Sequence, residues 1–153
     1  MLPTENRIER LYPADYARCA EIRNLQNDPY SEQFRQQVVA GERITYIYLR
    51  DEAFVGEISM VYEMHDADYT IPGKRVYISR LIVAPAYRRQ GIGSALVDFI
   101  LTESRRQGFC EASIGVDKDN TAALALYQKK GFTTVLFDGE DADGAYRKLL
   151  KYL

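Results

Sequence analysis

The chain has 153 residues, of which 46% are hydrophobic and 27% are charged, with a formal net charge of −2. This composition is typical of a globular protein that can bury a core, and we expect a single domain over residues 1–153. The slightly acidic balance argues against general nucleic-acid binding. No apolar run approaches the roughly 20 residues of a membrane span, and the first ten residues are charged, unlike a signal peptide. We therefore expect a cytoplasmic protein with no membrane partner.

The N-terminal half is predicted to contain two strands in a hairpin, preceded by one strand and two helices. We expect Ser31 to cap the second helix and Gly41 to end it. The loop from Met64 to Lys74 is long and polar, so it is either a wall of a binding site or a solvated connection. The predicted elements are a strand at 6–11, helices at 13–27 and 31–40, and hairpin strands at 44–49 and 54–62.

The centre of the chain is predicted to run from a strand into a basic loop and then into a helix. Apolar β-formers lead to Val83, and Pro85, which has no backbone N–H, ends the sheet pairing. From Ile92 the apolar residues recur at helical spacing, which places Gly91 and Gly93 on the first turn. The helix is predicted over 91–107 and is followed by a strand over 109–116, so these two strands should be parallel.

The C-terminal part is predicted as a helix over 121–130, capped by Asn120, and two strands at 132–137 and 145–150 around an acidic turn. Together the elements predict an α/β (α+β) fold. We expect a mixed, mostly antiparallel sheet of six or seven strands, with a central β-α-β crossover and helices on both faces.

The basic loop is suited to phosphate. A helix N-terminus leaves about four N–H groups unpaired and carries roughly half a positive charge, and glycines let the backbone approach an anion. Arg88 and Arg89 add charged donors just upstream. A P-loop would need a Lys after the glycines, and a dinucleotide fingerprint would need a third glycine where Leu96 stands. Both of these known phosphate loops therefore fit poorly.

Two motifs in order resemble the GNAT superfamily of N-acyltransferases. The first is Arg-x-x-Gly-x-Gly (Arg88, Gly91, Gly93), which resembles that family's acyl-CoA-binding motif. The second is Val-x-x-x-Asn-x-x-Ala-x-x-x-Tyr followed by Lys-Gly-Phe, which begins at Val116 and ends at Phe132. The resemblance covers residues 75 to 150 closely and implies the GNAT fold.

The resemblance implies acetyl-CoA as cosubstrate, in the gap where the central strand parts from the strand at 109–116, and no metal. Main chain at Leu81 and Val83 would take the pantetheine amides, and N–H groups from Arg89 to Ser94 would hold the pyrophosphate. The full set of expected cofactor-binding residues is Leu81, Ile82, Val83, Arg88, Arg89, Gln90, Gly91, Ile92, Gly93, Ser94, Asn120, Ala123, Tyr127 and Lys130.

The chemistry implied is direct attack of an amine on the thioester, without a covalent enzyme intermediate. A lysine-like amine with a pKa of about 10.4 is neutral in only about one molecule in 10³ at pH 7, so its proton needs an acceptor. Many family members use a Glu on the central strand, but here the inward residues are Tyr77, Ser79 and Leu81. A water held by Ser79 and Tyr77 is the favoured route, with Glu57 as the best single residue and Glu63 as the other candidate.

Tyr127 is expected to act as general acid, because a phenol with a pKa of about 10 can donate a proton to the departing CoA thiolate. Asn120 also has a complete structural role as a helix N-cap. Cys19 and Cys110 are expected to be reduced core thiols, because a nucleophilic cysteine would want a histidine partner and His65 lies in a polar loop.

Three hypotheses remain for function. The first is an N-acetyltransferase that acts on a primary amine, either a small molecule or an exposed protein amine, with a homodimer as one option for its assembly. The second is a catalytically impaired CoA-binding regulatory module, and the third is a nucleotide-binding domain of another kind. Acidic residues near the expected acceptor side predict a cationic acceptor, or else they only aid solubility. They are Glu57, Glu63, Asp66, Asp68, Asp138, Glu140, Asp141 and Asp143.

Overall fold

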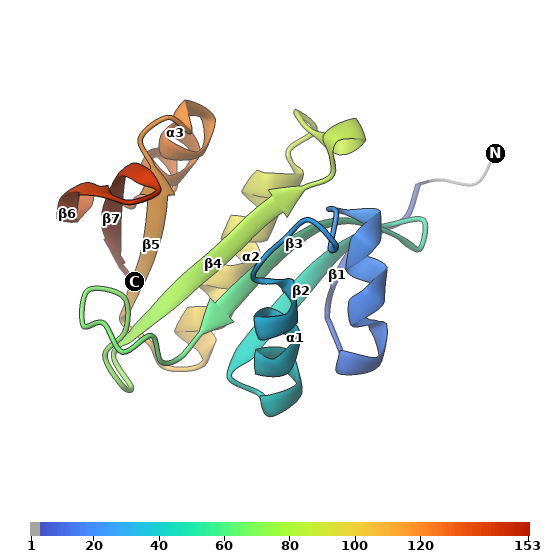
Figure 1. Ribbon diagram of the computed structural model, residues 1–153, viewed down its shortest axis with the longest axis horizontal. Coiled ribbons are helices and arrows are strands. Elements are labelled where there is room, and N and C mark those ends of the chain that lie inside the picture. Colours follow the sequence, from blue (N-terminus) through green and yellow to red (C-terminus); the bar gives the residue numbers. More distant parts are fainter. Residues whose placement is uncertain (1–3) are drawn as a thin grey trace. The chain divides into compact units, whose positions relative to one another are not determined.

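The computed structural model describes residues 4–153. Seven strands pair in the order β1-β2-β3-β4-β5-β7-β6 (Figure 1). β4 and β5 are parallel, whereas the pairs β1–β2, β5–β7 and β6–β7 are antiparallel. The predicted mixed, mostly antiparallel sheet with a β-α-β crossover is therefore confirmed. The elements are β1 (Asn6–Arg10), η1 (Pro13–Glu21), α1 (Ser31–Ala40), β2 (Arg43–Arg50), β3 (Ala53–Val61), β4 (Arg75–Val83), η2 (Pro85–Tyr87), α2 (Ile92–Arg106), β5 (Glu111–Asp117), α3 (Thr121–Lys129), β6 (Thr134–Asp141) and β7 (Gly144–Tyr152).

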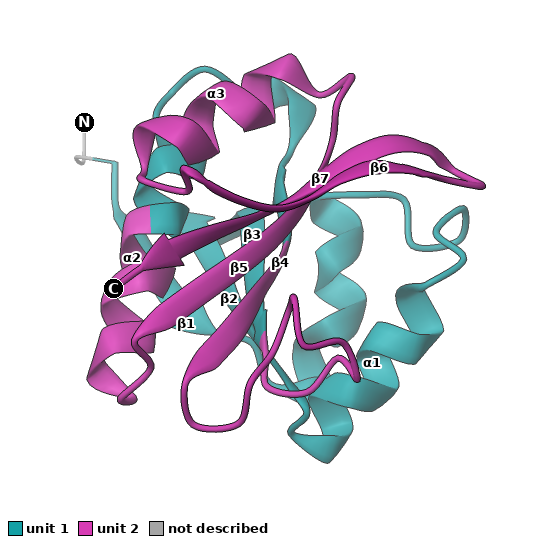
Figure 2. Ribbon diagram, turned by 90° about the vertical axis from the view of Figure 1, so that its left-hand side faces the viewer, with its two compact units in different colours: residues 1–60, 80–97 teal, residues 61–79, 98–153 magenta. Residues whose placement is uncertain are grey.

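The chain forms two compact units, coloured separately in Figure 2. Unit 1 (residues 1–60 and 80–97) has η1 and α1 on one face of its strands and the start of α2 on the other. At Gly56 in β3, a Cβ would lie 3.1 Å from side-chain atoms of both Ile92 and Leu96, so the absence of a side chain lets α2 approach the strand. The core beneath η1 and α1 is formed by Leu11, Tyr16, Cys19, Ile22, Val38, Ile47, Leu49 and Phe54.

Unit 2 (residues 61–79 and 98–153) contains the start of β4, the rest of α2, and β5, α3, β6 and β7. Parallel pairing of β4 with β5 runs from Arg75–Glu111 to Tyr77–Ser113. β5 then pairs with β7 along its whole length, from Glu111 to Asp117. Buried apolar residues of this unit include Ile100, Ala112, Ile114, Phe132, Leu149 and Leu150.

The predicted helix at 13–27 is wrong in type and length. Residues 13–21 form a 3-10 helix, and the next nine residues are irregular. Asn24 Oδ1 accepts hydrogen bonds from the backbone N–H groups of Gln26 and Asn27, at 3.0 and 3.2 Å, and Asp28 Oδ1 accepts one from Tyr30 at 2.9 Å. These short polar side chains bind the nearby backbone and thereby compete with the helix.

The last hairpin is longer than predicted. β6 continues through the acidic segment to Asp141, so the turn shrinks to two residues before Gly144, whose φ is +126°. Asp138 pairs with Arg147 across the hairpin, and their side chains form an ion pair at 3.0 Å. An opposite charge directly across the strands offsets the poor strand preference of aspartate.

Three smaller expectations are also wrong. Tyr30 rather than Ser31 is the N-cap of α1, and the Ser31 carbonyl accepts a hydrogen bond from the Tyr16 hydroxyl at 2.9 Å. Gly91 precedes α2 instead of lying on its first turn. Cys19 is buried as expected, and burial raises its pKa to about 12, but Cys110 is exposed. Both cysteines are free thiols.

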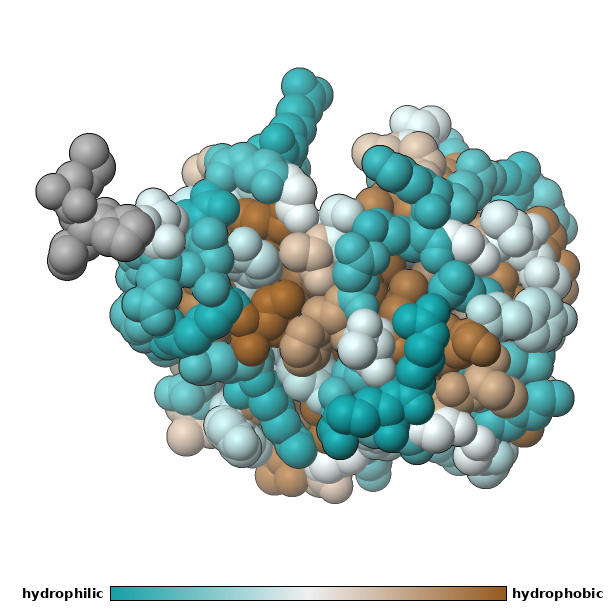
Figure 3. Space-filling model, turned by 180° about the vertical axis from the view of Figure 1, so that it is seen from behind, coloured by the Kyte–Doolittle hydropathy of each residue, from teal (hydrophilic) through white to brown (hydrophobic). Residues whose placement is uncertain are grey.

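Hydrophilic side chains predominate on the face shown in Figure 3, with hydrophobic residues in separate areas among them. The large exposed hydrophobic residues are likewise spread over different elements: Tyr12, Tyr30, Val39, Val135 and Tyr152. Among residues 4–153, no helix combines the length and the apolar character that crossing a membrane requires.

Candidate active site

The predicted phosphate loop lies in unit 1, between β4 and α2. Arg89 (φ +63°) and Gly91 (φ +81°) have left-handed backbone conformations, which turn the chain between η2 and the helix. The Ala95 N–H donates to the Gly91 carbonyl at 3.0 Å, the first hydrogen bond of α2. The N–H groups of residues 92–94 therefore belong to the first helical turn, where a helix offers no internal acceptor. This is the backbone arrangement that an anion site needs.

The side chains of this loop face solvent. Arg88, Arg89 and Gln90 are exposed, and Arg88 Nε donates to the Val83 carbonyl at 3.1 Å. Gln90 accepts a hydrogen bond from Arg50, whose guanidinium lies 5.7 Å from the Tyr87 ring centroid. The loop thus carries two exposed arginines, the charge that phosphate recognition needs.

The strand before the loop contains an irregularity that the sequence did not predict. Arg80 has φ +59°, which is left-handed and uncommon for a non-glycine residue within a strand. The regular alternation assumed for Tyr77, Ser79 and Leu81 is therefore interrupted between the last two. Leu81, Ile82 and Val83 are half-buried, and Ile82 packs against the core of unit 1.

Glu57, the candidate base, lies in a buried ionic cluster of unit 1. It is 3% exposed, and Arg23 Nε donates a hydrogen bond to Oε1. Arg23 also contacts Asp28 at 2.8 Å and the Tyr16 hydroxyl at 3.1 Å, and Arg80 pairs with the same Asp28. Burial raises the pKa of Glu57, while the guanidinium of Arg23 acts in the opposite direction. The carboxylate is therefore held by arginine in a site closed to bulk water.

Tyr127, the candidate acid, lies on α3 in unit 2. It is 7% exposed, and its ring meets Phe132 edge to face at 5.6 Å. Burial raises the pKa of Tyr127, and the neighbouring Tyr77 raises it further. The raised pKa keeps the phenol protonated but also makes it a weaker acid toward the CoA thiolate, whose thiol has an ordinary pKa of about 8.5. Ser79, from the same unit, is buried.

The remaining predicted cofactor residues of unit 2 lie on and around α3. Asn120 Oδ1 accepts a hydrogen bond from the Ala123 N–H at 3.1 Å, so Asn120 is the helix N-cap that the sequence predicted. Lys130 forms an ion pair with Asp98 at 2.8 Å. Asn120 and Lys130 therefore have structural roles that do not depend on a cofactor.

Sequence reasoning missed Tyr69, in the loop between β3 and β4. The ring centroids of Tyr69 and Tyr77 are 4.5 Å apart, and the Tyr69 carbonyl accepts a hydrogen bond from Ser113 Oγ at 2.6 Å. The one available signal was the length and polarity of this loop, which indicated a binding-site wall without selecting a residue. Arg23 was missed as well, because its partner Glu57 lies 34 positions away in the sequence.

Several members of the predicted acidic surface are neutralised by ion pairs. Lys148 Nζ lies 2.9 Å from Asp66 and 3.1 Å from Asp68, and Glu57 is paired with Arg23. Asp138 is paired with both Lys118 and Arg147. These pairs weaken the argument for a cationic acceptor, because less net negative charge is left to attract it.

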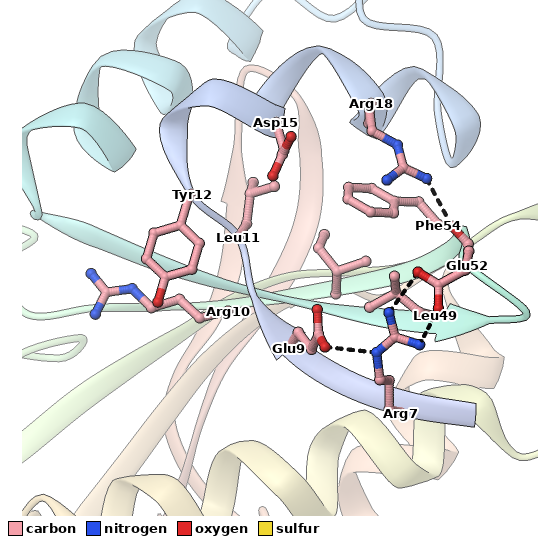
Figure 4. A pocket seen from close by; sticks show the side chains of 11 residues that line it. Arg7, Glu9, Arg10, Leu11, Tyr12, Asp15, Arg18, Leu49, Glu52 and Phe54 are labelled. Carbon is pink, nitrogen blue, oxygen red and sulfur yellow. Dashed lines mark hydrogen bonds and ion pairs between the residues drawn. The ribbon is translucent and has the colours of Figure 1, made fainter. Parts of the chain in front are cut away.

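A separate cavity of about 450 Å³ opens under η1 in unit 1 (Figure 4). Its charged lining is largely paired within itself: Arg7 binds Glu52 through two hydrogen bonds of 2.6 and 2.7 Å, and Arg18 lies 4.1 Å from the Phe54 ring centroid. It contains none of the predicted site residues. Among residues 4–153, no group of three His, Cys, Asp or Glu side chains could share a metal ion.

Comparison with known proteins assigns the fold and the family. A family model described as acetyltransferase (GNAT) family matches residues 6–132. N-alpha-acetyltransferase 30 of Schizosaccharomyces pombe is 28% identical over 115 residues, which are 74% of each chain. Human N-acetyltransferase 8 is 37% identical over 75 residues, 49% of this chain and 33% of that protein.

A solved structure of PaiA N-acetyltransferase from Thermoplasma acidophilum with coenzyme A has a TM-score of 0.74 at 19% identity, and the match covers 97% of this chain and 99% of that one. At that identity the likeness concerns the fold, while the family model covers most of the sequence. The chain belongs to the acetyltransferase (GNAT) family, whose members are acyl-CoA N-acyltransferases.

Proposed function

We propose that the chain transfers the acetyl group of acetyl-CoA directly to a primary amine, and that the amine is the α-amino group of a peptide or protein. The observation that carries the proposal is the GNAT family match over residues 6–132, with Tyr127 buried on α3 at the motif position expected of the acid. A phenol beside the departing CoA thiolate would donate or share a proton with it.

Acetyl-CoA is the proposed cosubstrate. Its pyrophosphate would be held by the N–H groups of residues 89–94, and the exposed Arg88 and Arg89 would add charge. Main chain at Leu81 and Val83 would bind the pantetheine amides, with Ile82 beside them. Asn120, Ala123 and Lys130, on and next to α3, remain predicted cofactor-binding residues. Support comes from the left-handed turn at Arg89 and Gly91, and from relatives of this fold solved with coenzyme A.

We infer the acceptor class from how few groups are available to take a proton from the amine. An α-amine has a pKa of about 7.7–8.0, so about one molecule in ten is already neutral at pH 7, against about one in 10³ for a lysine-like amine. Glu57, the best carboxylate candidate, is held by Arg23, and the other proposed route is a water at Ser79 and Tyr77. An α-amine, which is neutral at pH 7 far more often than a lysine-like amine, therefore matches such a site better. The names of two relatives, N-alpha-acetyltransferase 30 and an Escherichia coli ribosomal protein bS18-alanine N-acetyltransferase, agree with this class.

The test is a competition between amines. Purified protein and acetyl-CoA are incubated with a peptide that has a free N-terminus and no lysine, with the same peptide N-acetylated but carrying one lysine, and with a polyamine. Thiol release and product mass are recorded. We expect at least tenfold faster acetylation of the free N-terminus. Faster acetylation of lysine or polyamine would contradict the acceptor class.

The same experiment separates the enzyme from a regulatory module. Acetyl-CoA that raises the melting temperature without thiol release from any amine would mean that the chain binds its cosubstrate but does not transfer the acetyl group. No shift with acetyl-CoA, together with a shift from ATP, would overturn the cosubstrate itself.

A further inference from the structure

Gly115, in the middle of β5, makes room for the hydroxyl of Tyr69. A Cβ at position 115 would lie 2.5 Å from Tyr69 Oη and 3.3 Å from Cζ, and the first of these distances is too short for real atoms. A larger side chain at position 115 would therefore clash with Tyr69 in its observed position. Glycine weakens a strand interior and often marks a close approach there, which the phenol explains.

Tyr69 is held in this position from several sides. Its carbonyl accepts the Ser113 hydroxyl, and the ammonium of Lys148 lies 5.0 Å from its ring centroid. Lys148 also pairs with Asp66 and Asp68 of the same loop, and Arg75 donates to the carbonyls of residues 67 and 68 at 2.9 and 3.0 Å. The loop is thereby fastened to β4, β5 and β7, so that the Tyr69 ring has a defined place.

Tyr77 connects Tyr69 to the proposed route for removing a proton. The Tyr69 and Tyr77 ring centroids are 4.5 Å apart, and Tyr77 is one of the two residues proposed to hold the water that takes the proton of the amine. Tyr69 and Tyr77 are only half-buried and Gly115 is exposed, so this group of rings borders solvent that a substrate could displace. A displacement of the Tyr69 ring would therefore remove the ring against which Tyr77 packs.

We propose that Tyr69 is a positioning residue for acetyl transfer: its ring fixes Tyr77, which with Ser79 would hold the water that takes the proton of the amine, and Gly115 is the space that makes this placement possible. The inference rests on the proposed function, because it assigns Tyr69 a role in the proton removal that the proposed acetyl transfer requires. The aromatic ring of Tyr69 contacts Tyr77, and its hydroxyl is the group that lies against position 115.

The test is a set of four variants assayed for kcat at saturating acetyl-CoA, with the KM for acetyl-CoA and the melting temperature as companion readouts. The acceptor is the lysine-free peptide with a free N-terminus. Gly115→Ala forces the phenol away and should lower kcat about tenfold. Tyr69→Leu removes the ring and should have a similar effect. Tyr69→Phe keeps the ring and should retain kcat within about threefold. In each case the acetyl-CoA KM should stay within about threefold, because the cosubstrate is not touched.

The double variant Gly115→Ala/Tyr69→Phe tests whether Gly115→Ala acts through its contact with the Tyr69 hydroxyl. Removing the hydroxyl relieves the 2.5 Å contact, so the double variant should recover kcat to within about threefold of Tyr69→Phe. An equal loss from Gly115→Ala in both backgrounds, or full kcat in Gly115→Ala and Tyr69→Leu, overturns the inference. If Gly115→Ala does not fold, the contrast between Tyr69→Leu and Tyr69→Phe decides alone, and equal kcat in those two also overturns it. A wild-type chain that acetylates no amine overturns the proposed function instead.

Discussion

The phosphate loop of unit 1 and the tyrosine group of unit 2 are built in opposite ways. The loop consists of consecutive residues whose backbone torsions, at Arg89 and Gly91, turn the chain into the first turn of α2, where N–H groups have no acceptor within the helix. The tyrosine group (Tyr69, Tyr77 and Tyr127) takes its side chains from a loop, a strand and a helix, and the rings of Tyr69 and Tyr77 are in contact. The buried cluster around Glu57 resembles the second case, because its members come from distant parts of unit 1. A site made of backbone depends on which residues are glycine, whereas a site made of side chains depends on what surrounds each one.

The largest effect is expected at the buried cluster. Glu57→Gln leaves the Arg23 guanidinium with one carboxylate fewer in a place closed to water, and should lower the free energy of unfolding by about 3 kcal/mol. Urea unfolding measures it. The matched control is Glu52→Gln, which removes an ion-paired but largely exposed carboxylate and should lower the free energy of unfolding far less. Equal losses of unfolding free energy in the two variants would mean that burial does not make the Glu57–Arg23 pair more important for stability than an exposed pair.

The second effect tests the side-chain site directly. Tyr127→Phe removes the proton that the thiolate leaving group would receive, and should lower turnover by about 10² or more. The affinity for acetyl-CoA, read from its thermal shift, should stay within a few-fold. Tyr152→Phe, at an exposed tyrosine of β7, is the control and should keep full turnover. Unchanged turnover in Tyr127→Phe would leave Tyr127 only its packing role against Phe132.

The third effect tests the backbone site. Gly91→Leu should lose most of the acetyl-CoA stabilisation, about 2.7 kcal/mol at 100 times the dissociation constant, because the side chain blocks close approach of phosphate. Gly73→Leu is a matched control, since Gly73 also has positive φ (+70° against +81°) and empty space around its Cβ position. Both variants should lose about 1–2 kcal/mol of intrinsic stability. If both respond equally to acetyl-CoA, the loop does not bind it.

The smallest effect concerns pH and the loop that carries Tyr69. The Lys148 ammonium lowers the pKa of Asp66 below its usual value, so the pair stabilises the folded state above the ordinary aspartate pKa of about 3.9. This contribution is lost as pH falls through the lowered pKa. The stability difference between wild type and Lys148→Met should therefore be present at pH 7 and shrink below about pH 4. Lys129→Met, at an exposed lysine of α3, should show no such change. A difference that persists at pH 2 would assign Lys148 a packing role only.

Features that depend on neighbouring residues could be predicted from the sequence better than features that bring distant residues together. The strand, loop and helix around the phosphate motif were predicted closely, because proline, glycine and helical spacing act on neighbouring residues. Asn120 was identified as an N-cap for the same reason, and its side chain accepts the expected hydrogen bond. The helix predicted to reach Asn27 failed because Asn24 and Asp28 bind local backbone, and apolar spacing does not report that competition.

The candidate site was predictable only in part. Tyr127 was selected by a motif, but its burial depends on Phe132 and on the strands around it. Tyr69 could not be selected, because its contact with Gly115 joins residues 46 positions apart and requires the fold to be known. The pairing of Glu57 with Arg23 likewise spans 34 positions.

The division into two units has a consequence for how the chain folds during synthesis. Each unit consists of two separate stretches, and the chain passes from one unit to the other inside β3, inside β4 and inside α2. Neither unit can therefore be isolated by cutting the chain at one end. The ion pair between Asp28 and Arg80 closes a gap of 52 positions and forms only after the start of β4 has been made. A growing chain thus holds an incomplete first unit until residue 97 has left the ribosome. We expect folding to begin late and to be slowed by these distant contacts.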